Sequence, residues 1–299
     1  MTKRAQHHTR SGATAPDLAE IVRRFGPGIA PVTISRLPVF APVGRRPARE
    51  STATVETPWG RVQVTGRLSQ HHRQLLDAAV ATAVAIRLTE DGGVHLVIEP
   101  YQIMRLMDSR SWDYRWLEGL LADLRRAEVR IEENGHEFPL LVTGILTSFG
   151  RVPREKENRG GIGRRVSHRS DPGSEDLIQL TISGAWWGMW RDRPVAHYAR
   201  HLAVIGRMGT VGQAVARLAV TQPRGWRIGI DRALAAVGAW DDGHTPSARQ
   251  RRHHARTALT ADAEALAGIG VRLADGQIEY VPPGDVWVSV PPPAEPREP

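Results

Sequence analysis

Two tight-turn dipeptides, Asn134-Gly135 and Asp275-Gly276, constrain the fold of this chain more than any other sequence feature. The first separates the runs VRIEE and EFPLLVTGILTSF, and the second lies inside VRLADGQIEYVP. A turn of this kind between short alternating runs predicts a β-hairpin. Each predicted hairpin comes directly after a helical pattern, so the same ending is expected twice along the chain.

The residues before the first turn predict a regular series of elements. Apolar spacing indicates a strand, a long helix, a strand, a short helix and a second long helix that begins after Ser111, a good N-cap. These patterns are RVQVTG, LSQHHRQLLDAAVATAVA, VHLVIEP, YQIMRLM and SWDYRWLEGLLADLRRAEVRIEE.

A similar series precedes the second turn. The strand LIQLTISG is followed by helical patterns in AWWGMW, AHYARHLAVIG and TVGQAVARLAVTQ, by the extended GWRIGI and by the helical IDRALAAVGAW. In both halves the order is helix, short strand, helix, helix, hairpin, which is that of a winged helix.

We therefore predict an α+β fold with two tandem winged-helix domains joined by a basic flexible linker. Low apolar content predicts a mostly disordered arm at the N-terminus, although DLAEIVRRF has helical spacing. The predicted parts are the arm 1–58, a first domain 59–150, the linker 151–175, a second domain 176–283 that contacts DNA, and a Pro-rich tail 284–299.

Composition narrows the function classes. The 299 residues include no cysteine, which excludes disulfides, thiolate metal sites and cysteine nucleophiles. We find no apolar run near the roughly 20 residues of a membrane span and no apolar core of a secretion signal, so we expect a cytoplasmic protein that does not enter membranes.

The formal net charge of +8 points to an anionic partner. Only Lys3 and Lys156 are lysines, and every other basic side chain apart from histidine is arginine. A generic basic surface from a GC-rich genome is the alternative to a nucleic-acid partner.

The stretch TPSARQRRHHARTAL, 245–259, decides between these readings. Thr245 suits an N-cap and Pro246 the first helical position. Arg249, Arg252, His253 and Arg256 then fall in an arc about 100° wide beside an apolar face of Ala248, Ala255, Leu259 and Leu266. No acid occurs from Thr245 to Ala261, whereas a solvated charge face usually mixes signs. The pattern favours a DNA-contacting helix over a plain solvated face.

Sites for metals, cofactors and catalysis are not predicted. His253 and His254 are adjacent, so on a helix they point about 100° apart and cannot easily share an ion. The patterns HExxH, GxGxxG, the P-loop and GxSxG are absent. We expect a binding protein that is not an enzyme and needs no cofactor.

The corresponding helix of the first half, 111–127, interleaves acids with its basic residues Arg115, Arg125 and Arg126. We expect it to contact DNA weakly through phosphates, or to serve dimerisation.

Three segments of the second half resemble plasmid replication initiators of the RepC and TrfA types: ARHLAVIGRMGTVGQAVARLAV, GWRIGIDRALAAVGAW and SARQRRHHARTALTADAEALAGIGV. The first half matches in element order and in phrases such as VHLVIEPYQIMRLM, so the resemblance covers about 60–283. The basic segment 150–173 and the long N-terminal arm depart from it.

The resemblance implies a protein that binds directly repeated origin sequences (iterons) in double-stranded DNA, bends them, helps to open a nearby AT-rich region and recruits a helicase. It implies a homodimer contact in the first domain. It assigns base contacts to Arg249, Arg252, His253 and Arg256, and phosphate contacts to Arg251, Arg272, Arg164, Arg165 and Arg115. The alternatives are a winged-helix transcription regulator, a plasmid partition protein, or an enzyme or structural module with a basic surface.

Overall fold

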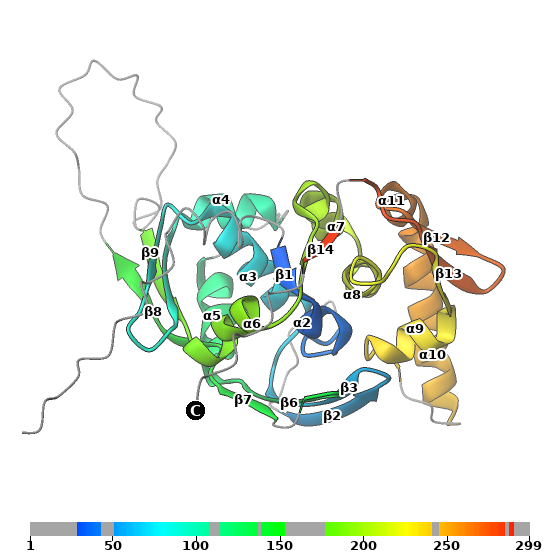
Figure 1. Cartoon of the computed structure of the whole chain (residues 1–299), viewed down its shortest axis with the longest axis horizontal. Helices are drawn as coiled ribbons and strands as arrows, with labels where there is room; N and C mark the ends of the chain where they lie inside the picture. Colours follow the sequence, from blue (N-terminus) through cyan, green and yellow to red (C-terminus); the bar gives the residue numbers. More distant parts are fainter. Residues whose placement is uncertain are drawn as a thin grey trace, which may run out of the picture.

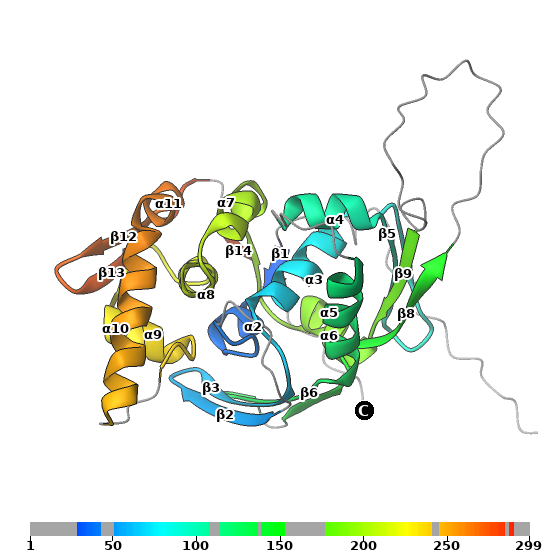
Figure 2. The same cartoon turned by 180° about the vertical axis from the view of Figure 1, so that it is seen from behind.

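The computed structural model describes residues 29–42, 51–107, 114–136, 139–152, 177–240, 245–284 and 287–289. It confirms a mixed α+β fold, with helices and four small sheets (Figures 1 and 2). Its buried apolar side chains form two clusters, one in each half of the molecule. None of the described helices is long and apolar enough to cross a bilayer.

The first half is built on helices that pack against a four-stranded antiparallel sheet. We call these elements the first unit: α3 (Gln70–Thr82), β4 (Ala85–Leu88), β5 (Val94–Ile98), α4 (Pro100–Leu106), α5 (Tyr114–Arg126), β8 (Leu146–Val152) and β9 (Leu177–Ile182). The strand order in this sheet is β4-β5-β9-β8. Leu96 and Leu180 face each other across β5 and β9, and both are buried.

The second half has the same arrangement without the additional edge strand. We call its elements the second unit: α8 (Thr210–Ala219), β11 (Trp226–Gly229), α9 (Ile230–Ala236), α10 (Pro246–Ala261), α11 (Ala263–Gly268), β12 (Val271–Ala274) and β13 (Gln277–Tyr280). The strand order is β11-β13-β12. In both units the strand directly before the second helix, β5 before α4 and β11 before α9, pairs with the last strand, so the repeat extends from element order to strand pairing.

The hairpin at Asn134-Gly135 forms as predicted, but it lies in a different sheet. Its strands β6 (Glu128–Glu133) and β7 (Leu140–Thr143) continue a curved sheet with β2 (Ser51–Thr57) and β3 (Gly60–Gly66), in the order β2-β3-β6-β7. This sheet lies along the lower edge of the molecule in Figure 1. Strands β8 and β9, which close the sheet of the first unit, occupy the place expected for that hairpin.

The predicted linker 151–175 does not separate two sheets. Val152 at the end of β8 pairs with Leu177 at the start of β9, so the chain leaves and re-enters the same sheet. The predicted boundary at 176 therefore falls inside the first unit. Helix α6 (Gly184–Asp192) also contributes its buried tryptophans to the first cluster.

Part of the predicted disordered arm is folded. Strand β1 (Ile29–Pro31) pairs with β10 (Val195–His197), and α2 (Val32–Arg36) follows it. Ala30 and Val32 join the second cluster, whereas Ile34, Leu37, Val39 and Phe40 join the first. The low average apolar content of 1–58 conceals this local apolar run. The predicted helix in DLAEIVRRF lies outside the described residues.

The chain end contains one more strand. Within the predicted Pro-rich tail, β14 (Trp287–Ser289) pairs with β10, so that β10 is the central strand of the sheet β1-β10-β14. Between β10 and α8 the chain forms a short 3-10 helix (Ala199–His201) and α7 (Leu202–Arg207).

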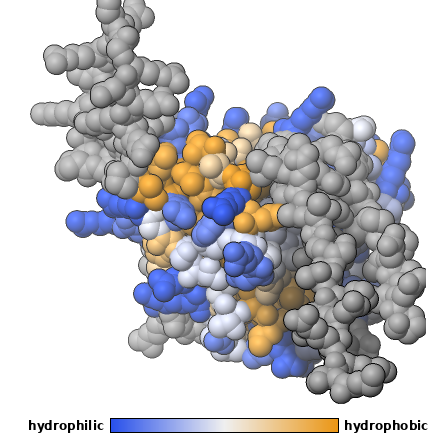
Figure 3. All heavy atoms as spheres, turned by 60° about the vertical axis from the view of Figure 1, so that its left-hand side comes forward, coloured by the Kyte–Doolittle hydropathy of each residue, from blue (hydrophilic) through white to orange (hydrophobic). Residues whose placement is uncertain are grey.

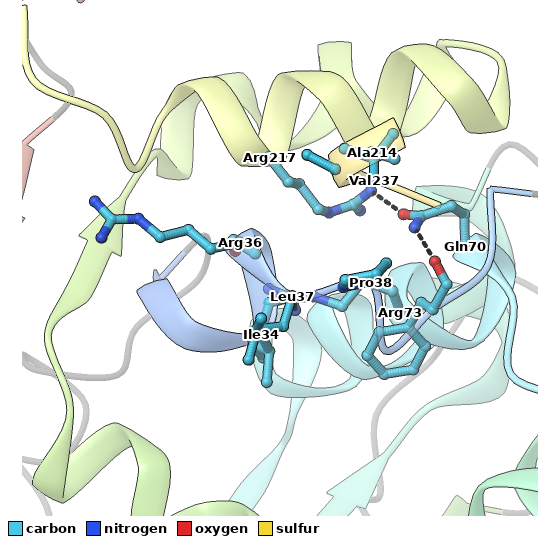
Figure 4. A pocket seen from close by; sticks show the side chains of 12 residues that line it. Ile34, Arg36, Leu37, Pro38, Gln70, Arg73, Ala214, Arg217 and Val237 are labelled. Atoms are coloured by element: carbon cyan, nitrogen blue, oxygen red, sulfur yellow. Dashed lines mark hydrogen bonds between the residues drawn. The ribbon is translucent and has the colours of Figure 1, made fainter. Parts of the chain in front are cut away.

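A buried polar network joins α3 of the first unit to α8 of the second (Figure 4). The Asp77 carboxylate accepts from Arg73 Nε at 3.0 Å and from Arg217 Nη2 at 3.1 Å. Arg217 Nη1 donates to Gln70 Oε1 at 3.0 Å, and Gln70 Nε2 donates to the Phe40 carbonyl at 2.7 Å. Helices α3 and α8 are the first helices of the two units. Because these hydrogen bonds join the two helices, they hold one unit against the other.

Candidate nucleic-acid interface

Helix α10 begins as the sequence predicts. Pro246 occupies the first turn, and the Thr245 hydroxyl accepts a hydrogen bond from the Ala248 amide at 3.2 Å. Ala248, Ala255 and Leu259 are buried and anchor the helix to the second unit. Leu266, expected on the same helix, is buried in α11, because α10 ends at Ala261.

Most of the remaining surface of α10 faces away from the protein, at the right-hand end of the molecule in Figure 1. Eleven of its sixteen residues are exposed, and none of the sixteen is acidic. The exposed residues are Pro246, Ser247, Arg249, Gln250, Arg251, His253, His254, Arg256, Thr257, Thr260 and Ala261.

The structure divides the four predicted base-contacting residues into two pairs. Arg249 and His253 lie one turn apart on the outer surface of α10 and are exposed. Arg252 is partly buried, and its guanidinium lies over the Trp240 ring at 4.9 Å from the ring centroid. Arg256 donates from Nε to Asp231 Oδ1 at 2.7 Å, and its Nη2 contacts Oδ2. Arg256 is therefore turned toward the start of α9, and Arg252 is turned toward Trp240, which follows the end of α9.

Three polar residues share the outer surface of α10 with Arg249 and His253 and were not predicted as site residues. They are Gln250, His254 and Thr257. A glutamine amide has both a donor and an acceptor for an adenine edge, so Gln250 is a base-contacting candidate. The sequence signal for Gln250 is its position on the side of the helix opposite the apolar face, and charge alone does not single it out.

The predicted phosphate-contacting residues are spread over several elements. Arg251 on α10 and Arg272 on β12 are exposed. Glu279, which faces Arg272 across the hairpin, accepts from Arg227 at 2.7 and 3.1 Å. Arg164 and Arg165 lie outside the described residues.

Helix α5 holds the place in the first unit that α10 holds in the second, but it is largely covered. Only three of its thirteen residues are exposed, and they are Arg115, Arg125 and Arg126. Glu118 on the same helix accepts from Arg151 of β8 at 2.6 and 3.0 Å. The first unit thus offers three exposed arginines near the two ends of α5, whereas the second offers a continuous helical surface.

The opposite end of the molecule has a different surface. Figure 3 shows apolar side chains there beside hydrophilic ones. The exposed large apolar side chains of the described residues all belong to the first half of the chain, and they are Val84, Tyr101, Leu106 and Leu141. The described part of the second unit has none of them, so its exposed surface is mainly polar.

The described residues contain no group of three His, Asp or Glu side chains that could hold a metal ion. A cleft of about 680 Å³ lies between the turn that joins β2 to β3 and the second unit. Tryptophan and arginine side chains line it, among them Arg252.

No protein-family model matches this chain, and no curated protein matches it in sequence. A solved structure, described as the crystal structure of the RctB domains 2-3, superposes with a TM-score of 0.46 and 9% sequence identity. The match covers 84% of this chain and 96% of the other. At this level of similarity it decides neither fold nor function, which rest on the geometry of the two units.

Proposed function

We propose that the second unit is a winged helix that binds duplex DNA, with α10 in the major groove. The exposed, acid-free surface of α10, separated from the β12-β13 hairpin only by the short α11, is the observation that carries the proposal. A recognition helix in such folds enters the groove, and the hairpin lies against the adjacent backbone. We propose that the first unit is a second winged helix, with β8 and β9 as its wing.

Arg249 and His253 are the proposed base-contacting residues, together with Gln250. An arginine fork matches the O6 and N7 acceptors of guanine. An exposed imidazole can donate a hydrogen bond to a purine base or to a phosphate oxygen. Arg252 and Arg256, engaged with Trp240 and Asp231, would act from the side of α10 instead of from its outer surface.

The phosphate contacts are proposed for residues that flank this surface. Arg251 on α10 and Arg272 on β12 are both exposed, so they suit contacts to the backbone on either side of the groove. Arg115, Arg125 and Arg126 would give the first unit a weaker, sequence-independent contact. The same unit is the proposed site of a homodimer contact.

In its biological role, we propose a plasmid replication initiator, a binding protein without catalytic activity of its own in the cytoplasm. This rests on the resemblance of the second half to such initiators and on the tandem arrangement of two similar units. Iteron binding, opening of an AT-rich region and recruitment of a helicase belong to this proposal. A winged-helix transcription regulator or a plasmid partition protein remains the second candidate, because the exposed α10 would serve either equally well.

The test is a footprint on the DNA that flanks the gene, with the purified full-length chain. We expect protection of direct repeats, and Arg249→Ala or His253→Ala should weaken it by about 1–3 kcal/mol. Arg61→Ala, at an exposed arginine of β3, is the matched control and should leave the footprint unchanged. Footprints that are identical in all four proteins would reject α10 as the DNA-contacting element.

The two biological candidates are separated by a second assay. A plasmid that contains the protected repeats should replicate only when the protein is supplied, if the protein is an initiator. Protection of a palindrome, with copy number independent of the protein, would favour a regulator.

A further inference from the structure

The cleft between the two halves is lined by tryptophan and arginine side chains. The turn between β2 and β3 provides Trp59, and the second unit provides Trp226 and Trp240. Its volume of about 680 Å³ lies within the range of sites that bind small organic molecules. The other residues relevant to binding are Arg227, Arg232 and Arg252.

Trp59 and Trp226 remain partly exposed although they pack against the core. Trp59 contacts both hydrophobic clusters, and Trp226 contacts the second. Partly exposed indole faces that line a cleft are suited to stacking with a planar group.

Two buried donors at the cleft have no acceptor among the described residues. The indole N–H of Trp240, a residue that is 8% exposed, makes no hydrogen bond in this part of the chain, and the same holds for Arg252 Nε. Both atoms are closed to solvent, so a ligand in the cleft would reach them only after these two side chains move.

The charges around the cleft favour an anion. Asp231 is paired with Arg256, and Arg227 is paired with Glu279. The Glu56 carboxylate also has a cationic neighbour, since its Oε1 lies 4.0 Å from Arg61 Nε. Arg232 is exposed and has no ion-pair partner within the described residues, so it and Arg252 supply the excess positive charge.

We propose that this cleft binds a nucleotide whose base is unpaired, with the base stacked on Trp59 or Trp226 and the phosphate near Arg232. Two sources have this chemistry, namely a free nucleotide and an unstacked nucleotide within single-stranded DNA. Arg252 lines the cleft and is also part of the proposed duplex contact, whereas Arg249 and His253 do not line the cleft, so the test uses Trp226 and Arg232, which the duplex proposal does not use.

The experiment measures binding of a fluorescein-labelled 20-nucleotide single strand of mixed sequence to the full-length chain, beside a duplex of the same sequence. Trp226→Ala should weaken single-strand binding about 5- to 160-fold, the range expected for the loss of one stacked base. Arg232→Ala, at an exposed site that cannot disturb the core, should weaken it in the same direction. Trp116→Ala, at a partly buried tryptophan of α5, is the control and should have no effect. Duplex binding should be unchanged in each variant.

A second measurement uses the unmodified protein and does not depend on how a variant folds. A single strand with 5-iododeoxyuridine should form a photo-crosslink to Trp59 or Trp226, identified by mass spectrometry. If free deoxynucleotide at millimolar concentration prevents the crosslink, the free nucleotide is a ligand of the cleft. If the crosslink persists, the ligand is an unstacked nucleotide within single-stranded DNA. Crosslinks only to residues outside the cleft, or unchanged binding in both Trp226→Ala and Arg232→Ala, would overturn the proposal.

Discussion

Arg256 of α10 and Asp231 of α9 form a two-point ion pair, with Nε and Oδ1 2.7 Å apart. Both side chains are substantially exposed, at 53% and 43%. The pair therefore adds little stability, since exposed ion pairs contribute about 0–1 kcal/mol. Its larger effect is to place a carboxylate beside the proposed DNA-contacting surface and to neutralise one of its guanidinium groups.

Replacing Asp231 with asparagine should strengthen duplex binding. The change removes one negative charge and frees Arg256 for a phosphate, and each additional phosphate contact steepens the dependence of log affinity on log salt by about 0.9. Fluorescence anisotropy at several salt concentrations measures both quantities. A slope equal to that of the unchanged protein would show that Arg256 does not reach the DNA even when it is free.

Asp77→Ala should destabilise the protein strongly. The substitution leaves Arg73 and Arg217, which are 1% and 3% exposed, without their shared carboxylate. Removing one partner of a buried ion pair costs about 3–5 kcal/mol. Urea unfolding followed by circular dichroism measures this loss, and Asp91→Ala, at an exposed turn, should lower the stability far less. A loss of similar size in both variants would contradict the structural role of the network.

The pH dependence of stability should include a contribution from His71. Burial, and secondarily the neighbouring His72, lowers the pKa of His71, whose ring packs edge-on against Trp116. In the unfolded chain the imidazole titrates near its ordinary pKa of about 6.5, so the unfolded state binds the proton more readily. Stability should therefore fall as the pH drops below about 6.5 and continue to fall down to the lowered pKa of the folded state.

His71→Gln should flatten this decline in urea unfolding measured between about pH 7 and pH 5. Burial also lowers the pKa of His197, so a smaller decline of the same sign should remain in the variant. His254→Gln, at an exposed side chain of α10, serves as the control. A steeper decline in His71→Gln would show that the sign is wrong.

Gly212→Ala should destabilise the protein even though alanine favours helices. A Cβ at position 212 would overlap the carboxylate of Asp262, which accepts a hydrogen bond from the Gly209 amide at 2.9 Å. Overpacking of this kind typically costs about 1–3 kcal/mol. Gly268→Ala is the matched control, since a Cβ there meets no atom within 4 Å. Equal melting temperatures for the two variants would count against a close fit between α8 and Asp262.

Local patterns in the sequence were sufficient to predict most helices and hairpins. Thr245 and Pro246 mark the start of α10, and the turn at Asp275-Gly276 adopts positive φ at both residues, as the tightest hairpins require. Such features depend on near neighbours alone. Which strands pair depends on contacts between distant residues, so the place of the Asn134-Gly135 hairpin in a separate sheet could not be predicted from alternation.

The candidate site could be predicted as a helix but only partly as a surface. Helical geometry placed Arg249, Arg252, His253 and Arg256 in one arc, and it could not show which of them meet neighbours. Asp231 and Trp240 come from another part of the second unit, and their contacts with Arg256 and Arg252 appear only when α9 packs beside α10. The Trp59 wall of the cleft is more distant still, because it comes from the first half of the chain.

The pairing of Val152 with Leu177 makes the two ends of the intervening segment neighbours in space. A single protease cut within that segment would leave each fragment held by the hydrogen bonds of β8, β9 and β5. The nicked protein should thus run as one species under native conditions and as two bands once denatured.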